Sequence, residues 1–221
     1  ILIGLVGSEM CIRDRYRGSL PEFDQQKKIY VFASHSHYDH FNKKIFGWSE
    51  QYPDVRYILS ADIVGKEQSE EQSERTVYVT ANKKYDFDGI KVQTLQSTDE
   101  GVAFIVYMED KVIYHAGDLN WWHWEEETES YNEQMRQDYQ REIDKLKDIV
   151  IDIAFVPLDP RQENQYAWGM DYFMKHTHTK YVFPMHMWGD YEVYDRLMEN
   201  PEAEPYKDLS LIHISEPTRP I

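Results

Sequence analysis

The sequence is poor in three features that would each point to a particular class of protein. It has one cysteine in 221 residues, which excludes an intrachain disulfide framework and a zinc site built from cysteines. No apolar run approaches the roughly 20 residues that a membrane-spanning helix needs. Basic residues are scarce, with 24 Lys and Arg against 40 Asp and Glu, so the formal net charge is -16. We therefore expect neither a nucleic-acid partner, which would require phosphate neutralisation, nor a membrane partner.

Strand and helix signals alternate along the chain. Short runs rich in β-branched and aromatic residues predict strands at 28–34, 55–59, 76–80, 90–96, 102–107, 112–115, 151–157 and 180–184. Apolar residues at helical spacing predict helices at 41–51, 125–149, 166–176 and 191–199. Clusters of strands separated by amphipathic helices predict an α/β fold in which sheets and helices form layers.

The segment His-Ser-His-Tyr-Asp-His, at 35–40, follows directly after the first of these strands. Because alternate residues of an extended segment point the same way, His35 and His37 can converge on one point, while Asp39 and His40 serve a second. Imidazole and carboxylate together suit zinc, manganese or iron rather than calcium or magnesium. The segment therefore predicts a divalent-metal site rather than a polar loop with incidental histidines.

This H-x-H-x-D-H pattern after a core strand resembles the signature of the metallo-β-lactamase-fold superfamily. Two further motifs appear in the order of that family: Gly117-Asp118 at the end of a hairpin strand, and Pro184-Met185-His186 at the end of a later strand. The resemblance covers most of residues 28–189 and is nearest to the broad branch that includes ascorbate-6-phosphate lactonase-like hydrolases. It implies an α/β four-layer αββα sandwich.

The resemblance also implies a set of metal ligands: His35 and His37 at a first metal, Asp39, His40 and His186 at a second, and Asp118 bridging both. A hydroxide held by the metals would be the nucleophile, because a bound metal lowers the pKa of water to about 7. In this interpretation Asp39 also orients or deprotonates that water, as the catalytic residue.

One expected ligand is missing. The family places a third first-site histidine at a turn between the two leading motifs, and the corresponding segment 96–102 contains none. Ser97 falls where that histidine would stand, and Asp99 could supply an oxygen ligand instead. His123 is a more remote surrogate. The number of metal ions, one or two, and their identity, zinc first with manganese or iron as alternatives, therefore stay open.

Asp159 and Arg161 follow the predicted strand 151–157, at the end of a strand where α/β sheets often place their sites. Arg161 could hold an anionic group of a substrate bidentately, with Asp159 beside it. A surface ion pair would explain the same two residues equally well.

The leading interpretation is a metal-dependent hydrolase acting on an ester, lactone, amide or phosphodiester of a small substrate, phosphorylated or not. The alternative is a non-catalytic metal-binding or sensor domain whose first metal site is partly degraded. The fold also hosts di-iron oxygen reductases, but those resemble H-x-E-x-D-H, and His37 argues against them. The default location is cytoplasmic.

Both ends of the chain resemble a translated sequencing-library adapter, one end in each orientation. We therefore predict non-native tails at 1–15 and 209–221 around a native hydrolase domain at 16–208. The single cysteine, Cys11, falls in the first tail. Strands that precede the H-x-H-x-D-H motif in the family would then be absent, so we expect an N-terminally truncated domain with an exposed sheet edge.

Overall fold

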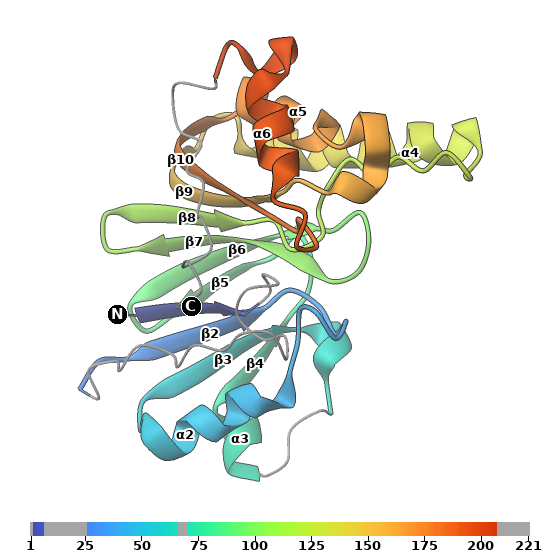
Figure 1. The fold of residues 1–221 in the computed structure, drawn as a ribbon. Helices are drawn as coiled ribbons and strands as arrows, with labels where there is room; N and C mark the ends of the chain where they lie inside the picture. The colour runs from blue at the N-terminus through green and yellow to red at the C-terminus, as the bar shows by residue number, and fades with distance from the viewer. Residues whose placement is uncertain (1, 7–25, 66–69, 207–221) are drawn as a thin grey trace, which may run out of the picture.

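A computed structural model describes residues 2–6, 26–65 and 70–206 and shows two β-sheets packed face to face between helices (Figure 1). The smaller sheet is parallel, in the order β1 (Leu2–Val6), β2 (Ile29–Ala33), β3 (Val55–Ser60), β4 (Thr76–Val79). The larger sheet runs β10 (His178–Met185), β9 (Val150–Pro157), β8 (Lys111–His115), β7 (Val102–Met108), β6 (Ile90–Gln96), β5 (Lys84–Phe87). Strands β5 to β8 pair antiparallel, whereas β8, β9 and β10 pair parallel.

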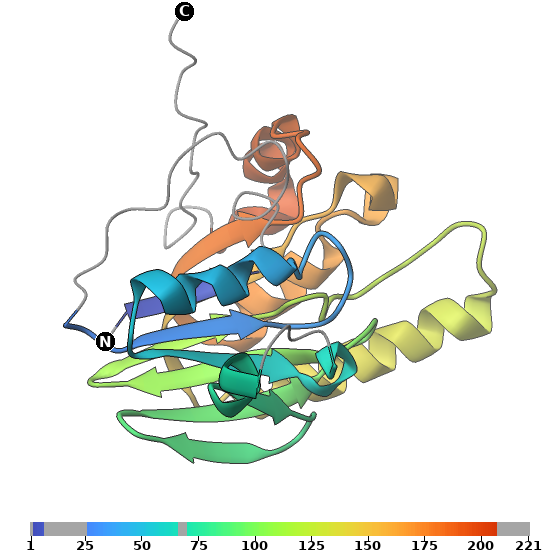
Figure 2. The ribbon, with the colours of Figure 1, turned by 90° about the horizontal axis from the view of Figure 1, so that it is seen from below.

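The helices cover the outer faces of the two sheets (Figures 1 and 2). The smaller sheet carries α2 (Trp48–Gln51) and α3 (Glu70–Glu74), and the larger carries α4 (Glu129–Ile143), α5 (Trp168–His176) and α6 (Glu192–Glu199). Short 3-10 segments lie at Lys43–Gly47, Ala61–Ile63, Asp144–Leu146, Pro160–Gln165 and Pro201–Ala203. No helix of the described segments has both the length and the apolar character to cross a membrane.

The layering follows from the two-residue period of the strands. In β2, Ile29 and Val31 join the cluster under the 3-10 segment Lys43–Gly47, while Tyr30 and Phe32 point to the other sheet. The strands of the larger sheet alternate in the same way between the inter-sheet core and the cluster beneath α4, α5 and α6. Three apolar layers therefore separate four layers of secondary structure, which confirms the predicted α/β sandwich.

Most predicted elements are present, with differences that have local causes. Helix α4 begins at Glu129 rather than 125 because the Thr128 side chain caps it, accepting a hydrogen bond from the Tyr131 amide at 3.2 Å. The helix predicted at 41–51 is split into a 3-10 segment and one α-helical turn. Strand β5 was not predicted, since its Lys-Tyr-Asp-Phe sequence is half charged.

The edge of β2 differs from expectation. Residues 2–6, which belong to the predicted non-native tail, form β1 and pair parallel with β2 from Leu2 opposite Ile29 to Val6 opposite Ala33. The edge that we expected to be exposed is therefore covered by this strand. The remainder of both predicted tails lies outside the described residues, and the non-native origin of the tails stays a prediction.

Candidate metal centre

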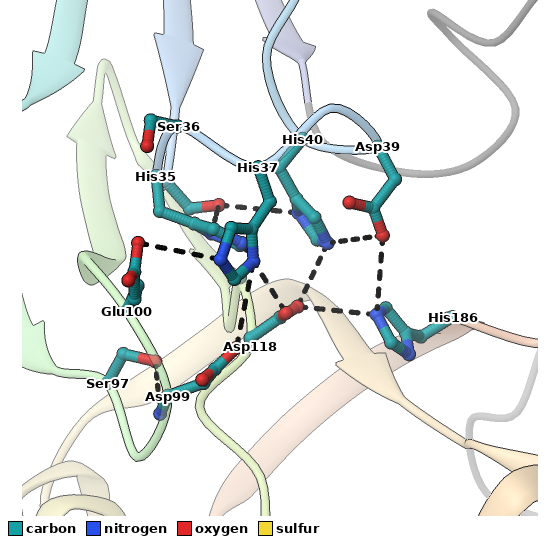
Figure 3. Close-up of polar contacts among 12 residues, drawn as sticks. His35, Ser36, His37, Asp39, His40, Ser97, Asp99, Glu100, Asp118 and His186 are labelled. Carbon is teal, nitrogen blue, oxygen red and sulfur yellow. Dashed lines mark hydrogen bonds and ion pairs between the residues drawn. The ribbon is translucent and has the colours of Figure 1, made fainter. Parts of the chain in front are cut away.

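The predicted ligand residues meet at one edge of the sandwich, because each lies at or just beyond the end of a strand. The His35–His40 loop follows β2, Asp118 follows β8, and His186 follows β10. Asp99 lies in the turn between β6 and β7. Figure 3 shows these side chains, which come from both sheets, pointing toward one another.

A first group consists of His35, His37, Asp99 and Asp118, whose candidate ligand atoms all lie within 4.8 Å of one another. His35 Nε2 is 3.5 Å from Asp118 Oδ2, and His37 Nδ1 is 3.8 Å from Asp99 Oδ2. His35 and Asp118 are buried, whereas the side chains of His37 and Asp99 are 43% and 45% exposed. Asp99 thus completes this group where the missing histidine was expected.

A second group consists of Asp39, His40 and His186, and all three residues are buried. Asp39 Oδ2 lies 3.5 Å from His40 Nε2 and 4.0 Å from His186 Nε2. Two imidazoles and a carboxylate therefore converge where little side-chain surface is exposed.

Asp118 lies between the two groups. Its Oδ2 faces His35, while its Oδ1 lies 3.0 Å from His40 Nε2 and 3.5 Å from His186 Nε2. Burial alone would raise the pKa of Asp118, but the close contact with His40 and the neighbouring imidazoles hold it well below its usual range. The carboxylate is therefore ionised, with one oxygen toward each group.

The donor atoms fit a divalent cation. Among the described residues, His35 Nε2 and His186 Nε2 are buried and have no hydrogen-bond partner, an arrangement that is costly unless something else occupies their lone pairs. Burial and the charge of His40 lower the pKa of His35 to about 4, so its imidazole is neutral at pH 7, as a metal ligand must be. Imidazole and carboxylate together suit zinc, manganese or iron.

Ser34 supports both groups, and sequence reasoning did not single it out. Its Oγ lies 3.0 Å from His35 Nδ1 and 3.5 Å from His40 Nδ1. Gly101 and Gly117, both with positive φ, pack against Ser34 so closely that a Cβ on either would lie within 2.6 Å of it. The glycine of the Gly117-Asp118 motif was the available signal for this close approach.

Asp159 has a different role from the one predicted. Its side chain is fully buried, so it is not available to a substrate. Its Oδ2 instead accepts a hydrogen bond from His186 Nδ1 at 2.9 Å, which leaves Nε2 directed at Asp39 and Asp118. His186 has φ 66, a strained conformation for a residue other than glycine and one typical of functional sites.

The remaining candidates are divided. Ser97 is buried, and its Oγ accepts a hydrogen bond from the Asp99 amide at 3.1 Å, so it shapes the turn that carries Asp99. His123 packs edge-on against Trp168 and belongs to neither group. Glu100, which the sequence analysis did not propose, places its Oε2 3.5 Å from His37 Nε2.

Comparison with known proteins identifies the fold. No protein-family model matches the chain, and no curated protein matches its sequence. Among solved structures, CmlA from Streptomyces venezuelae, described as a diiron beta-hydroxylase, is similar with a TM-score of 0.52 at 8% identity, over 85% of this chain and 44% of that chain. This chain thus spans less than half the length of CmlA. YhfI from Bacillus subtilis, described as a metallo-beta-lactamase fold protein, is similar with a TM-score of 0.52 at 12% identity. The similarity covers 83% of this chain and 73% of YhfI. At these identities the likeness is one of architecture, and the protein has the metallo-β-lactamase fold.

Proposed function

We propose that the protein is a metal-dependent hydrolase that acts on a small ester, lactone, amide or phosphodiester. The observation that carries this proposal is the pair of adjoining groups that share Asp118, with unpartnered imidazole nitrogens of His35 and His186 directed into them. The metallo-β-lactamase fold supports it. The net charge of -16 favours a small substrate over a nucleic acid. The cytoplasmic location remains a prediction.

In this proposal each group would hold one divalent ion, and Asp118, which turns one oxygen toward each group, would serve both. When bound, such an ion lowers the pKa of a water molecule to about 7, so that hydroxide is available at neutral pH. Asp39 is placed to orient that water or to accept its proton, since its carboxylate lies at the buried centre. The burial of Asp39, His40 and His186 limits the contact of the second group with bulk solvent.

A second candidate function is iron-dependent oxygen chemistry. With Asp99 in place of a third histidine, each group combines two imidazoles with one carboxylate beside the shared Asp118. Two histidines and a carboxylate with open positions are typical of non-haem iron oxygenases. CmlA, whose description names a diiron centre, has a similar fold.

Metal loading and activity assays separate these functions. The full chain is prepared metal-free, loaded in turn with zinc, manganese or ferrous iron, and analysed for bound metal. It is then assayed on 4-nitrophenyl acetate, bis(4-nitrophenyl) phosphate and dihydrocoumarin, and for oxygen consumption with the iron form. We expect hydrolysis that disappears with chelator and in Asp118→Asn but persists in His178→Gln, a variant of an exposed histidine at the opposite end of β10 from His186.

Two results would contradict the hydrolase proposal. Oxygen consumption by the iron form without hydrolysis would favour the second candidate. A folded, metal-loaded protein that is inert in every assay would favour the non-catalytic metal-binding domain.

A further inference from the structure

Arg161 lies next to the second group and is connected to it through one carboxylate. Its Nη2 is 2.5 Å from Asp159 Oδ2, the same oxygen that accepts a hydrogen bond from His186 Nδ1. Its Nε is 3.0 Å from both oxygens of Asp159. The guanidinium group is therefore held at a fixed place, one side chain away from a candidate metal ligand.

Asp159 does not need this guanidinium to be oriented. Its Oδ1 already accepts a hydrogen bond from the Arg161 backbone amide at 2.9 Å, and its Oδ2 is already engaged by His186. Both oxygens thus have a partner before the arginine side chain is counted. The guanidinium is surplus to that task, which raises the question of what else it binds.

The surroundings of Arg161 leave one side of it open. Its Cζ lies 4.2 Å from the centre of the Trp188 ring and 5.8 Å from that of Trp124, so indoles pack against it. The side chain remains 46% exposed, and the side-chain hydrogen bonds that it makes to Asp159 use Nε and Nη2. Trp188 also lies against His186, with ring centres 5.4 Å apart, so this open side is close to the second group.

We propose that Arg161 binds an anionic group of the substrate, a carboxylate or a phosphate, close to the bond that is cleaved. The inference rests on the proposed hydrolase function and specifies its substrate class. A guanidinium group fixed on one edge presents its remaining donors in a geometry that suits planar or tetrahedral oxyanions.

The kinetic test compares two esters that share a leaving group. The metal-loaded protein is assayed on 4-nitrophenyl acetate, which is neutral, and on mono-4-nitrophenyl succinate, which carries a carboxylate. In Arg161→Gln we expect the ratio of kcat/KM for the anionic ester to that for the neutral ester to fall by roughly 10-fold to 100-fold, chiefly through KM, because a charge-assisted contact is lost. Arg161→Lys, which keeps the positive charge but lacks the paired N–H donors of a guanidinium group, should give an intermediate ratio.

Arg196→Gln is the matched control, since that arginine also stacks on an aromatic ring, Tyr166, at 4.4 Å but contacts no candidate ligand. It should leave the ratio unchanged. Thermal melts of all variants verify folding. An unchanged ratio in folded Arg161→Gln would overturn the proposal.

A binding test does not depend on turnover. Inorganic phosphate and, separately, acetate are titrated into metal-free full-length protein labelled with ¹⁵N, and the indole N–H signal of Trp188 is followed. We expect this signal to shift in the wild type and not in Arg161→Gln, with the stronger response identifying the preferred anion. If neither ester is hydrolysed, the hydrolase proposal fails, and the titration alone then decides whether Arg161 binds anions. Equal shifts in wild type and Arg161→Gln would refute the site.

Discussion

The two ligand groups share Asp118 but differ in how they are built into the fold. All three residues of the second group are buried, and His186 is held from behind by the buried carboxylate of Asp159. In the first group, the side chains of His37 and Asp99 are nearly half exposed, although the turn that carries Asp99 is tied to distant segments through Thr98. Similar ligand residues are thus buried in the second group and partly exposed in the first.

This difference predicts an order of metal binding. Ligands that are already oriented lose little conformational freedom when an ion binds, and a partner behind a ligating histidine strengthens binding further. We therefore expect the second group to bind metal more tightly and to release it more slowly than the first. The following variants test this difference in metal affinity between the two groups.

The largest effect is expected from removing a ligand of the second group. His186→Ala should lower the affinity of the tighter ion by more than about 100-fold and should abolish hydrolysis. Loss of a residue that only supports a ligand lowers metal affinity by about 10-fold to 100-fold, and loss of the ligand itself should cost more. His37→Ala, the corresponding change in the first group, should weaken only the looser ion. Calorimetric zinc titrations of both variants measure this, and equal losses in the two would contradict the asymmetry.

A smaller effect on metal affinity is expected from changing a residue that supports a ligand. Asp159→Asn keeps the shape of the side chain but weakens its acceptor for His186 Nδ1. We expect the affinity of the tighter ion to fall by about 10-fold to 100-fold, with the looser ion unaffected. Competition with a chromophoric chelator gives both constants, and Asp110→Asn, at an exposed hairpin residue, serves as the control. A loss confined to the looser ion would show that Asp159 does not support the second group.

Asp99→His should reduce the asymmetry from the other side. A third imidazole in place of the carboxylate makes the first group resemble the family pattern and suits zinc better than manganese or iron. We expect the looser zinc ion to bind about tenfold more tightly. We also expect the preference of this group for manganese to fall, measured by metal content after exposure to equal concentrations of both. An unchanged zinc constant would mean that Asp99 is not a ligand.

The smallest effect is a pH dependence of stability in the metal-free protein, opposite in sign for the two groups. Burial lowers the pKa of His35 to about 4, while an unfolded histidine titrates near about 6.5. Between these values the unfolded state binds more protons at this residue, so His35 lowers the free energy of unfolding as pH falls from about 6.5 to 4.

For His186, burial opposes a charge, but the hydrogen bond to Asp159 and the charge of Asp118 outweigh it and raise the pKa. This residue therefore contributes stability below its unfolded pKa, and that stability is lost as pH rises through its folded pKa. Urea unfolding from pH 7.5 to 4.5 should thus show a flatter acid decline in His35→Gln and a steeper one in His186→Gln. Parallel profiles would refute the opposite shifts.

Much of the candidate site could be predicted from one short segment of sequence. His35, His37, Asp39 and His40 were predicted because they lie in one short segment after a strand, where spacing alone decides which side chains converge. The layered α/β fold was predicted because clusters of strands are separated by amphipathic helices, and the resemblance to the family implied the four-layer sandwich. Strand β5 was missed because half of its residues are charged, and a pairing partner, β6, rather than burial, defines it.

Three-dimensional neighbours explain what the sequence could not decide. The sequence offered Ser97 and Asp99 as substitutes for the missing histidine, and only the folded turn shows that the Asp99 carboxylate lies within reach of His35, His37 and Asp118. Asp159 was correctly placed at a strand end but given the wrong role, because its contact with His186 spans segments far apart in sequence. The covering of the β2 edge by residues 2–6 likewise depends on pairing between distant segments.

Ser34 joins the loops of the candidate metal centre, so these loops cannot be redesigned one at a time. Its carbonyl accepts the Val102 amide at 3.0 Å, its hydroxyl lies beside one histidine of each group, and two glycines, Gly101 and Gly117, close over it. Three loops that carry candidate ligands therefore meet on a single small residue. If one ligand loop were transplanted alone, the contacts of the other two loops with Ser34 would be lost. The three loops must therefore be exchanged together.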